Sequence, residues 1–104
     1  MTQSGMLLRA MPAARPRNWT FLTNHAAVLV SIDRNPGARI DDVAAEIGIS
    51  RRAAQMIVSD LAEDGYIERT RIGRRNHYRV REEMPLRRKG FQDSDVRALL
   101  TLLR

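Results

Sequence analysis

The apolar positions between residues 24 and 34 recur with the period of an α-helix. Thr23 precedes this stretch and can cap the first turn, because its hydroxyl can accept a backbone amide that has no partner inside the helix. The sequence Asn-Pro-Gly at 35–37 ends the pattern. We therefore expect a helix over about 24–34. Its inner stripe should consist of Val28, Leu29 and Ile32.

Two further helical patterns follow, and a short turn joins them. The first, DDVAAEIG at 41–48, opens with two acids that suit the positive N-terminus of a helix and closes on Gly48, which favours a tight turn. Ser50 is a strong N-cap for the second pattern, RRAAQMIVSDLAED, which ends at a glycine. After that glycine, Tyr66 can fold back on Leu61. The residues expected to face inward are Val43, Ala44 and Ile47 in the shorter helix and Ala54, Ile57, Val58 and Leu61 in the longer one.

In the next part of the chain, side chains that alternate between two faces replace the helical period. Two extended segments, about 66–71 and 76–81, meet around Gly73 and predict a small β-hairpin. In the second segment, one side should carry Tyr78 and Val80, and the other should carry His77 and Arg79.

Four shorter stretches complete the pattern. WTFL at 19–22 has strand character, and ARI at 38–40 is expected to be extended. MPLRRKG at 84–90 is predicted to be a linker, and DSDVRALLTLL at 93–103 is predicted to be a capped helix. The stripe of this last helix should consist of Val96, Leu99, Leu100 and Leu103. The chain is therefore expected to be mainly α with a small β-hairpin.

Positive charge is concentrated in the predicted hairpin rather than spread along the chain. The sequence has a net charge of +6, yet residues 20–68 carry four basic and eight acidic side chains. Residues 69–81 carry six arginines and no acid. Because the planar fork of arginine binds phosphate through two hydrogen bonds, this edge is typical of a surface that binds a polyanion. The alternative is that the arginines keep an exposed strand edge from pairing with other strands.

The most informative unit is DVAAEIGISRRAAQMIVSDL at 42–61. Its small inner residues Ala44 and Ala54 let two helices cross closely, and Gly48 permits the sharp turn between them, which predicts a helix-turn-helix. The basic hairpin follows directly. In this order of elements, and in EIGISRRAAQMIVSDLAEDGYIERTRIGRRNHYRV, the chain resembles winged helix-turn-helix transcriptional regulators of the bacterial MarR-like and ArsR-like kind over about residues 22–81. The resemblance implies binding to DNA, usually by a symmetric dimer.

Three parts of the chain are expected from this resemblance and from the charge pattern. Residues 1–18 should form a flexible basic arm, and residues 19–82 should form a winged helix-turn-helix DNA-binding domain. Residues 83–104 should form a linker and a C-terminal helix that serves dimerisation.

The predicted interface has two components. The recognition helix, about 50–64, should enter the major groove, where arginine can pair with guanine and glutamine with adenine. The wing, about 66–81, should lie on the phosphate backbone or in the minor groove. The residues predicted to contact DNA are Ser50, Arg51, Arg52, Gln55, Met56, Ser59, Arg71, Arg74, Arg75, Asn76 and His77.

Met56 departs from the pattern that the resemblance implies. The corresponding position is basic in many regulators of this kind, and here it is apolar. Two roles stay open for it: contact with a thymine methyl group, or packing beneath the wing.

The sequence offers no arrangement typical of an enzyme. It has no cysteine, no glycine-rich phosphate loop with lysine and no set of zinc ligands. His25 and His77 lie in different elements, and the acids Asp41, Asp42 and Glu46 are better explained by the helix dipole and by solvent than by a metal. We expect no catalytic residue, no metal and no cofactor.

The expected partners are double-stranded DNA and a second copy of the chain, since the C-terminal stripe and the Trp19–Leu22 segment offer apolar surface. A small-molecule effector is compatible with such regulators, but the sequence reveals no pocket for one. No signal peptide or membrane span is evident, so we expect a cytoplasmic protein that associates with the nucleoid through DNA. The alternative function is a winged-helix module for protein–protein contacts without specific DNA binding, in which the acidic body, residues 20–68, would be the working surface.

Overall fold

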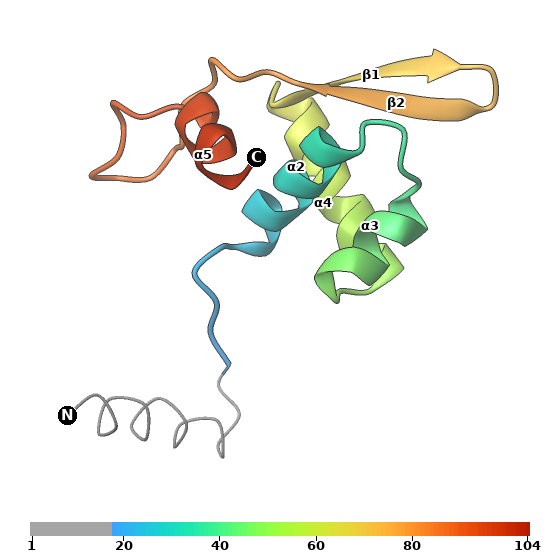
Figure 1. Cartoon of the computed structure of the whole chain (residues 1–104), viewed down its shortest axis with the longest axis horizontal. Coiled ribbons are helices and arrows are strands. Elements are labelled where there is room, and N and C mark those ends of the chain that lie inside the picture. Colours follow the sequence, from blue (N-terminus) through green and yellow to red (C-terminus); the bar gives the residue numbers. More distant parts are fainter. Residues whose placement is uncertain (1–17) are drawn as a thin grey trace.

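The computed structural model describes residues 18–104, which form four helices and one antiparallel two-stranded sheet (Figure 1). The arm predicted for residues 1–18 lies outside this part of the chain, apart from Asn18. In chain order the elements are α2 (Asn24–Arg34), α3 (Ile40–Ile47), α4 (Arg51–Glu63), β1 (Ile67–Ile72), β2 (Arg75–Val80) and α5 (Val96–Leu103). This order confirms the predicted fold of mainly α structure with a hairpin after the third helix.

Side chains cap the helices where the sequence predicts them. The hydroxyl of Thr23 accepts a hydrogen bond from the Ala26 amide at 3.1 Å, and the hydroxyl of Ser50 accepts one from the Ala53 amide at 3.0 Å. Each bond satisfies an amide that the helix itself leaves without a partner. The start of α4 is therefore fixed by a local contact.

Two glycines end α3 and α4 in left-handed backbone conformations. Gly48 has a φ of 76°, and its amide donates to the Ala44 carbonyl at 2.9 Å. Gly65 has a φ of 83°, after which the Tyr66 amide returns to the Leu61 carbonyl at 2.8 Å. Tyr66 and Leu61 are both buried, so the predicted helix terminator is confirmed.

The core is built around α2, which contacts α3, α4, β2 and α5. Five consecutive residues of α2, from 28 to 32, are buried, which is more than the one stripe that the sequence predicts. A helix covered on several sides buries more than its amphipathic face. Among the described residues, the largest side chains that are fully buried are Ile32, Leu100, Val28 and Val96.

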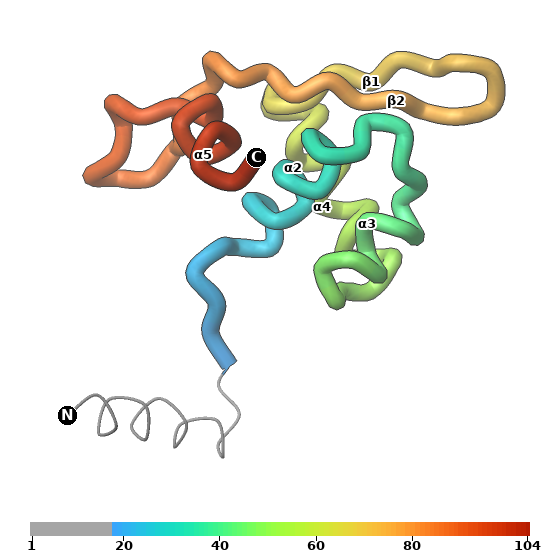
Figure 2. The backbone as a smooth tube through the Cα atoms, in the orientation of Figure 1, coloured from blue at the N-terminus to red at the C-terminus, as the bar shows by residue number. Residues whose placement is uncertain are grey.

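The hairpin pairs Ile67 with Val80 at its base and Ile72 with Arg75 at its tip. Its strands lie within a residue or so of the predicted ones. On its other edge, β2 meets the loop between α2 and α3, where the Tyr78 amide donates to the Pro36 carbonyl at 3.1 Å. The hairpin thus extends beyond the helices while its base is anchored to them (Figure 2).

Two local predictions are wrong. WTFL at 19–22 forms no strand, because no neighbouring strand in the described part of the chain pairs with it. ARI at 38–40 forms no extended element either, since Ile40 already belongs to α3. Arg39, the N-cap of α3, has an extended conformation there, with a ψ of 157°.

The C-terminal helix packs on the same core as the rest of the domain. Val96 and Leu100 are buried, and Leu99 and Leu103 are half-buried against the core, so the predicted stripe faces inward. Leu102 remains 79% exposed. The described residues therefore form one folded unit, and dimerisation through this helix stays a prediction.

Candidate nucleic-acid interface

The outward face of α4 carries all the residues that the sequence places there. Arg51, Arg52, Gln55, Met56 and Ser59 are exposed, whereas Ala54, Ile57, Val58 and Leu61 are buried on the opposite side. Ser50 is exposed too, although its hydroxyl serves as the helix cap. A shallow groove runs along this face, and its lining comes from α4 alone. The lining residues are Arg52, Gln55, Met56, Ser59 and Asp60.

A second cleft lies between the helix-turn-helix and the wing. The start of α3, the first residue of α4 and the tip of the hairpin all contribute to it. Its charged lining consists of four arginines against a single aspartate: Arg39, Arg51, Arg74, Arg75 and Asp41. We call this the wing-side cleft. In this cleft Arg51 of α4 lies near Arg74, Arg75 and Asn76 of the hairpin. The sequence assigns α4 and the hairpin as separate elements and does not reveal this proximity.

Arg51 has an acidic neighbour inside this cleft. Its Nε atom lies 2.6 Å from Oδ1 of Asp41, and both side chains are about two-thirds exposed, at 67% and 68%. An ion pair this exposed contributes little to stability, because water screens it. Arg51 can therefore exchange Asp41 for another negative group without weakening the fold.

The wing arginines divide into paired and unpaired groups. Arg79 forms an ion pair with Glu68, and Arg81 lies 2.9 Å from Glu83. The other four have no acidic partner in the part of the chain that the structure describes: Arg69, Arg71, Arg74 and Arg75. Arg71 and Arg75 donate only to backbone carbonyls, those of Gly73 at 3.4 Å and Gly37 at 3.3 Å, which carry no net charge. The unpaired positive charge is thus concentrated toward the tip.

His77 is not brought into the wing-side cleft. Its ring is half-buried against Gly37, where a β-carbon would lie 2.9 Å from the His77 Cε1 atom. Gly37 thus allows the His77 ring to pack closely on the backbone, and His77 helps to anchor the wing to the loop between α2 and α3. Asn76, its neighbour in β2, lines the cleft instead.

Sequence reasoning assigned no role to Arg39. This exposed residue is the N-cap of α3 and lines the wing-side cleft. The first helix of a helix-turn-helix crosses the DNA backbone, so a basic residue at its N-terminus is well placed for phosphate. The signal available in the sequence was a lone arginine separated by Ile40 from DDVAAEIG.

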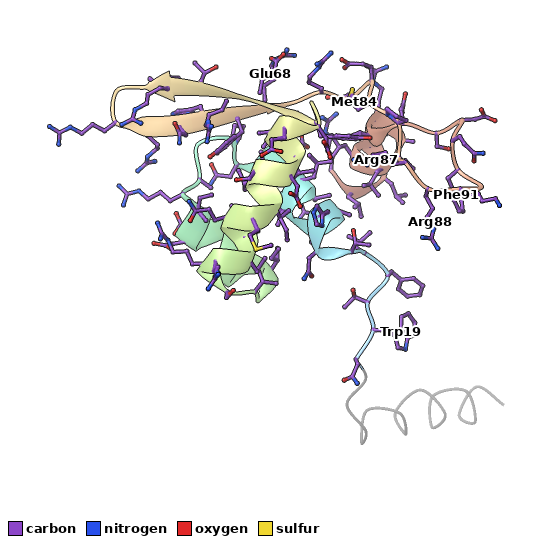
Figure 3. The ribbon with its side chains drawn as sticks, turned by 180° about the vertical axis from the view of Figure 1, so that it is seen from behind. Trp19, Glu68, Met84, Arg87, Arg88 and Phe91 are labelled. Carbon is purple, nitrogen blue, oxygen red and sulfur yellow. The ribbon has the colours of Figure 1, made fainter. Side chains whose placement is uncertain are left out.

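A separate cavity lies on the other side of the domain, between α2, the end of α4 and the C-terminal segment. Its apolar lining includes Leu29, Leu61 and Val96. At its rim, His25 Nε2 lies 2.9 Å from Asp60 Oδ2, and Arg87 Nη1 donates to Asp64 Oδ2 at 2.7 Å. Figure 3 shows Arg87 beside the helices, whereas Arg88 and Phe91 extend on the loop beyond it.

Three features of the cavity rim are electrostatic or conformational. The hydrogen bond to Asp64 raises the pKa of Arg87, and burial raises the pKa of Tyr66. Arg87 also has a φ of 62°, in the left-handed region.

Within residues 18–104, no group of three or more histidines or acids is arranged to hold a metal ion. No helix in this range is long and apolar enough to cross a membrane.

The three-helix core, the turn at Gly48 and the basic hairpin define a winged helix-turn-helix protein. The sequence matches the MarR family over residues 20–74, which is more than half of the chain, so this protein belongs to the MarR family. Members of this family are transcription regulators, and the prediction that the chain is not an enzyme is confirmed.

The fold is also similar to that of FabT from Streptococcus pneumoniae, solved in complex with DNA. The TM-score is 0.54 at 18% sequence identity, and the match covers 98% of this chain but 66% of the FabT chain. At this identity the likeness concerns the fold. Among curated proteins, none shows a significant match to the sequence.

Proposed function

We propose that this protein regulates transcription by binding specific sequences in double-stranded DNA, with α4 in the major groove and the wing on the backbone or in the minor groove. The observation that carries the proposal is the wing-side cleft, where unpaired arginines of the wing meet Arg51 at the start of α4. A cleft lined mainly by one sign of charge, here four arginines against one aspartate, focuses its field and attracts the opposite charge. FabT, which shares the fold, is bound to DNA in its crystal structure.

The outward face of α4 has the chemistry of base readout. Arg51 and Arg52 stand at the N-terminal end, which is the part of a recognition helix that reaches base edges. Arginine can bind guanine O6 and N7 with two hydrogen bonds, and the amide of Gln55 can bind adenine N6 and N7 in the same way. Arg39 would contact the backbone beside them.

The wing supplies affinity with little sequence information. Arg71, Arg74 and Arg75 carry charges that no acid of the described residues neutralises. Each phosphate contact releases condensed counterions from the duplex, which favours binding at low salt. Where the minor groove is narrow, as in A·T tracts, its negative potential would also attract one of these side chains.

A homodimer would present two such surfaces. Leu102, Trp19 and Phe21 are exposed by 79%, 58% and 91%, and Trp19 and Phe21 form an edge-on aromatic pair with ring centroids 5.1 Å apart. Contiguous exposed apolar patches mark interaction surfaces, and we propose that the Trp19–Phe21 pair belongs to one. A two-fold dimer would bind half-sites about 34–36 Å apart, so selected sites should be palindromic.

The test is selection of bound sequences from a random duplex pool with the wild-type chain, followed by titration of the best duplex at several salt concentrations. We expect an enriched palindromic motif, affinity that falls as salt rises, and little competition from single-stranded RNA. Absence of an enriched motif together with absence of duplex binding at low salt would contradict the proposal. It would favour the protein-contact module, with the acidic body, residues 20–68, as its surface.

A further inference from the structure

Met56 is a large apolar side chain placed in the middle of the outward face of α4. It is 61% exposed and lies outside the hydrophobic core. The groove around it is lined only by α4, so no residue of the wing covers it. Of the two roles left open by the sequence, packing beneath the wing does not occur in this structure.

The other residues that line this groove are all polar. Arg52 lies one turn before it, Ser59 and Asp60 lie about one turn after it, and Gln55 adjoins it. The carboxylate of Asp60 is engaged by His25 at 2.9 Å. Met56 is therefore the apolar part of a face whose other members suit hydrogen bonding.

The major groove offers one prominent apolar group to such a side chain. Thymine carries a C5 methyl group there, whereas the remaining readable positions are hydrogen-bond donors and acceptors. Methionine is flexible and polarizable, so its thioether can adapt to a methyl group without a fixed geometry. We propose that Met56 reads the methyl group of a thymine in the bound sequence. This inference rests on the proposed function of α4 as the recognition helix.

The helix geometry limits where this thymine lies. Met56 lies four positions after Arg52, and at about 1.5 Å per residue this corresponds to about 6 Å along the helix axis. Successive base pairs are about 3.4 Å apart. The thymine should therefore lie within about two base pairs of the base that Arg52 contacts.

The experiment removes only the methyl group. In the best duplex obtained by selection, each thymine is replaced singly by uracil, which keeps base pairing and every hydrogen-bonding group. Binding of the full chain is measured by fluorescence anisotropy. We expect one position in each half-site at which uracil lowers the affinity roughly fourfold, the effect of one buried carbon group.

Variants of Met56 test whether this side chain causes the loss of affinity on uracil substitution. In Met56→Ala the same uracil substitution should leave affinity unchanged, whereas Met56→Leu, which keeps an apolar side chain, should retain the loss. Glu63→Ala, at an exposed position of α4 outside the predicted interface, is the matched control and should respond to uracil like the wild type. Circular dichroism checks that each variant is folded, which we expect because both positions are exposed.

Two results would overturn the inference while leaving the proposed function intact. One is specific binding that no uracil substitution weakens, and the other is an equal uracil loss in wild type and Met56→Ala. Failure to find any preferred duplex would instead contradict the proposed function itself, and the role of Met56 with it.

Discussion

Arginine serves opposite purposes in the wing and in the C-terminal segment, which extend to opposite ends of the molecule (Figures 1 and 3). In the C-terminal segment, Arg104 binds Asp33 through two bonds of 3.0 Å and Glu82 through one of 2.7 Å, and Arg97 also reaches Glu82 at 3.2 Å. Near the wing tip, by contrast, Arg74 has no acidic partner among the described residues.

The difference shows that the partner of an arginine, rather than the number of arginines, indicates its role. The carboxylates of Asp33 and Glu82 raise the pKa of Arg104 and connect the end of α5 to α2 and to the segment after β2. Arg97 and Arg104 thus complete the fold with internal acids. The charges at the wing tip are available to an external anion and do not stabilise the isolated domain.

The largest expected effect concerns the C-terminal segment, which stabilises the fold. Leu100 is fully buried where α5 packs on the core, so Leu100→Ala should lower the free energy of unfolding by about 2–5 kcal/mol, through lost burial and the cavity left behind. Urea denaturation measures this loss. Where the variant remains folded, each protomer should bind DNA with the affinity of the wild type. A variant as stable as the wild type would show that α5 is peripheral to the fold.

The next effect concerns base readout by α4. Arg51→Ala or Gln55→Ala should cost about 1–3 kcal/mol of binding free energy on the best selected duplex and much less on random duplex. Both side chains are exposed, so thermal stability should hold. Equal losses on both duplexes, measured by anisotropy, would mean that these residues contact only phosphate.

A substitution of Asp41 tests the ion pair that it forms with Arg51. Asp41→Asn removes the negative charge 2.6 Å from Arg51 and should raise affinity modestly for every duplex, because DNA no longer displaces an internal partner. Weaker binding by this variant, in the same assay, would indicate that Asp41 instead holds Arg51 in its binding position.

The smallest effect is a pH dependence in the C-terminal network. Hydrogen bonds from Arg104 and then Arg97 hold the pKa of Glu82 below its ordinary value of 4.5. A lowered pKa in the folded state stabilises the protein above the unfolded pKa, and this contribution disappears as the pH falls through the folded value. Glu82→Gln should therefore be slightly less stable than wild type at pH 7, and the gap should shrink below pH 4.5. A gap that does not change between pH 7 and pH 3 would contradict this origin.

Local chemistry allowed much of the fold to be predicted from sequence. The caps at Thr23 and Ser50 and the turn at Gly48 depend on residues within a few positions of one another. The outward face of α4 follows from its helical period in the same way. The prediction of a strand at WTFL is wrong because a segment with strand propensity forms a strand only where another strand pairs with it.

The assembly of the site required contacts that local patterns do not reveal. Arg75 reaches the Gly37 carbonyl across 38 positions of sequence, and His77 packs on the same glycine. Arg79 belongs to the arginine-rich stretch, yet Glu68 on the facing strand neutralises it. Arg39 enters the wing-side cleft because β2 folds back beside the loop between α2 and α3. Such pairings are set by tertiary packing.

The central claim is that unpaired charge at the wing tip binds DNA phosphates, and the salt dependence of binding tests it most directly. The double variant Arg74→Ala/Arg75→Ala is compared with Arg88→Ala/Lys89→Ala, which removes the same charge from the loop at the opposite end of the molecule. The wing variant should bind specific and random duplexes more weakly, with the slope of log affinity against log salt reduced by up to about 2. The loop variant should keep the wild-type slope. Equal slopes in wild type and both variants would contradict the account, and so would equal losses in the two variants, since only net charge would then matter.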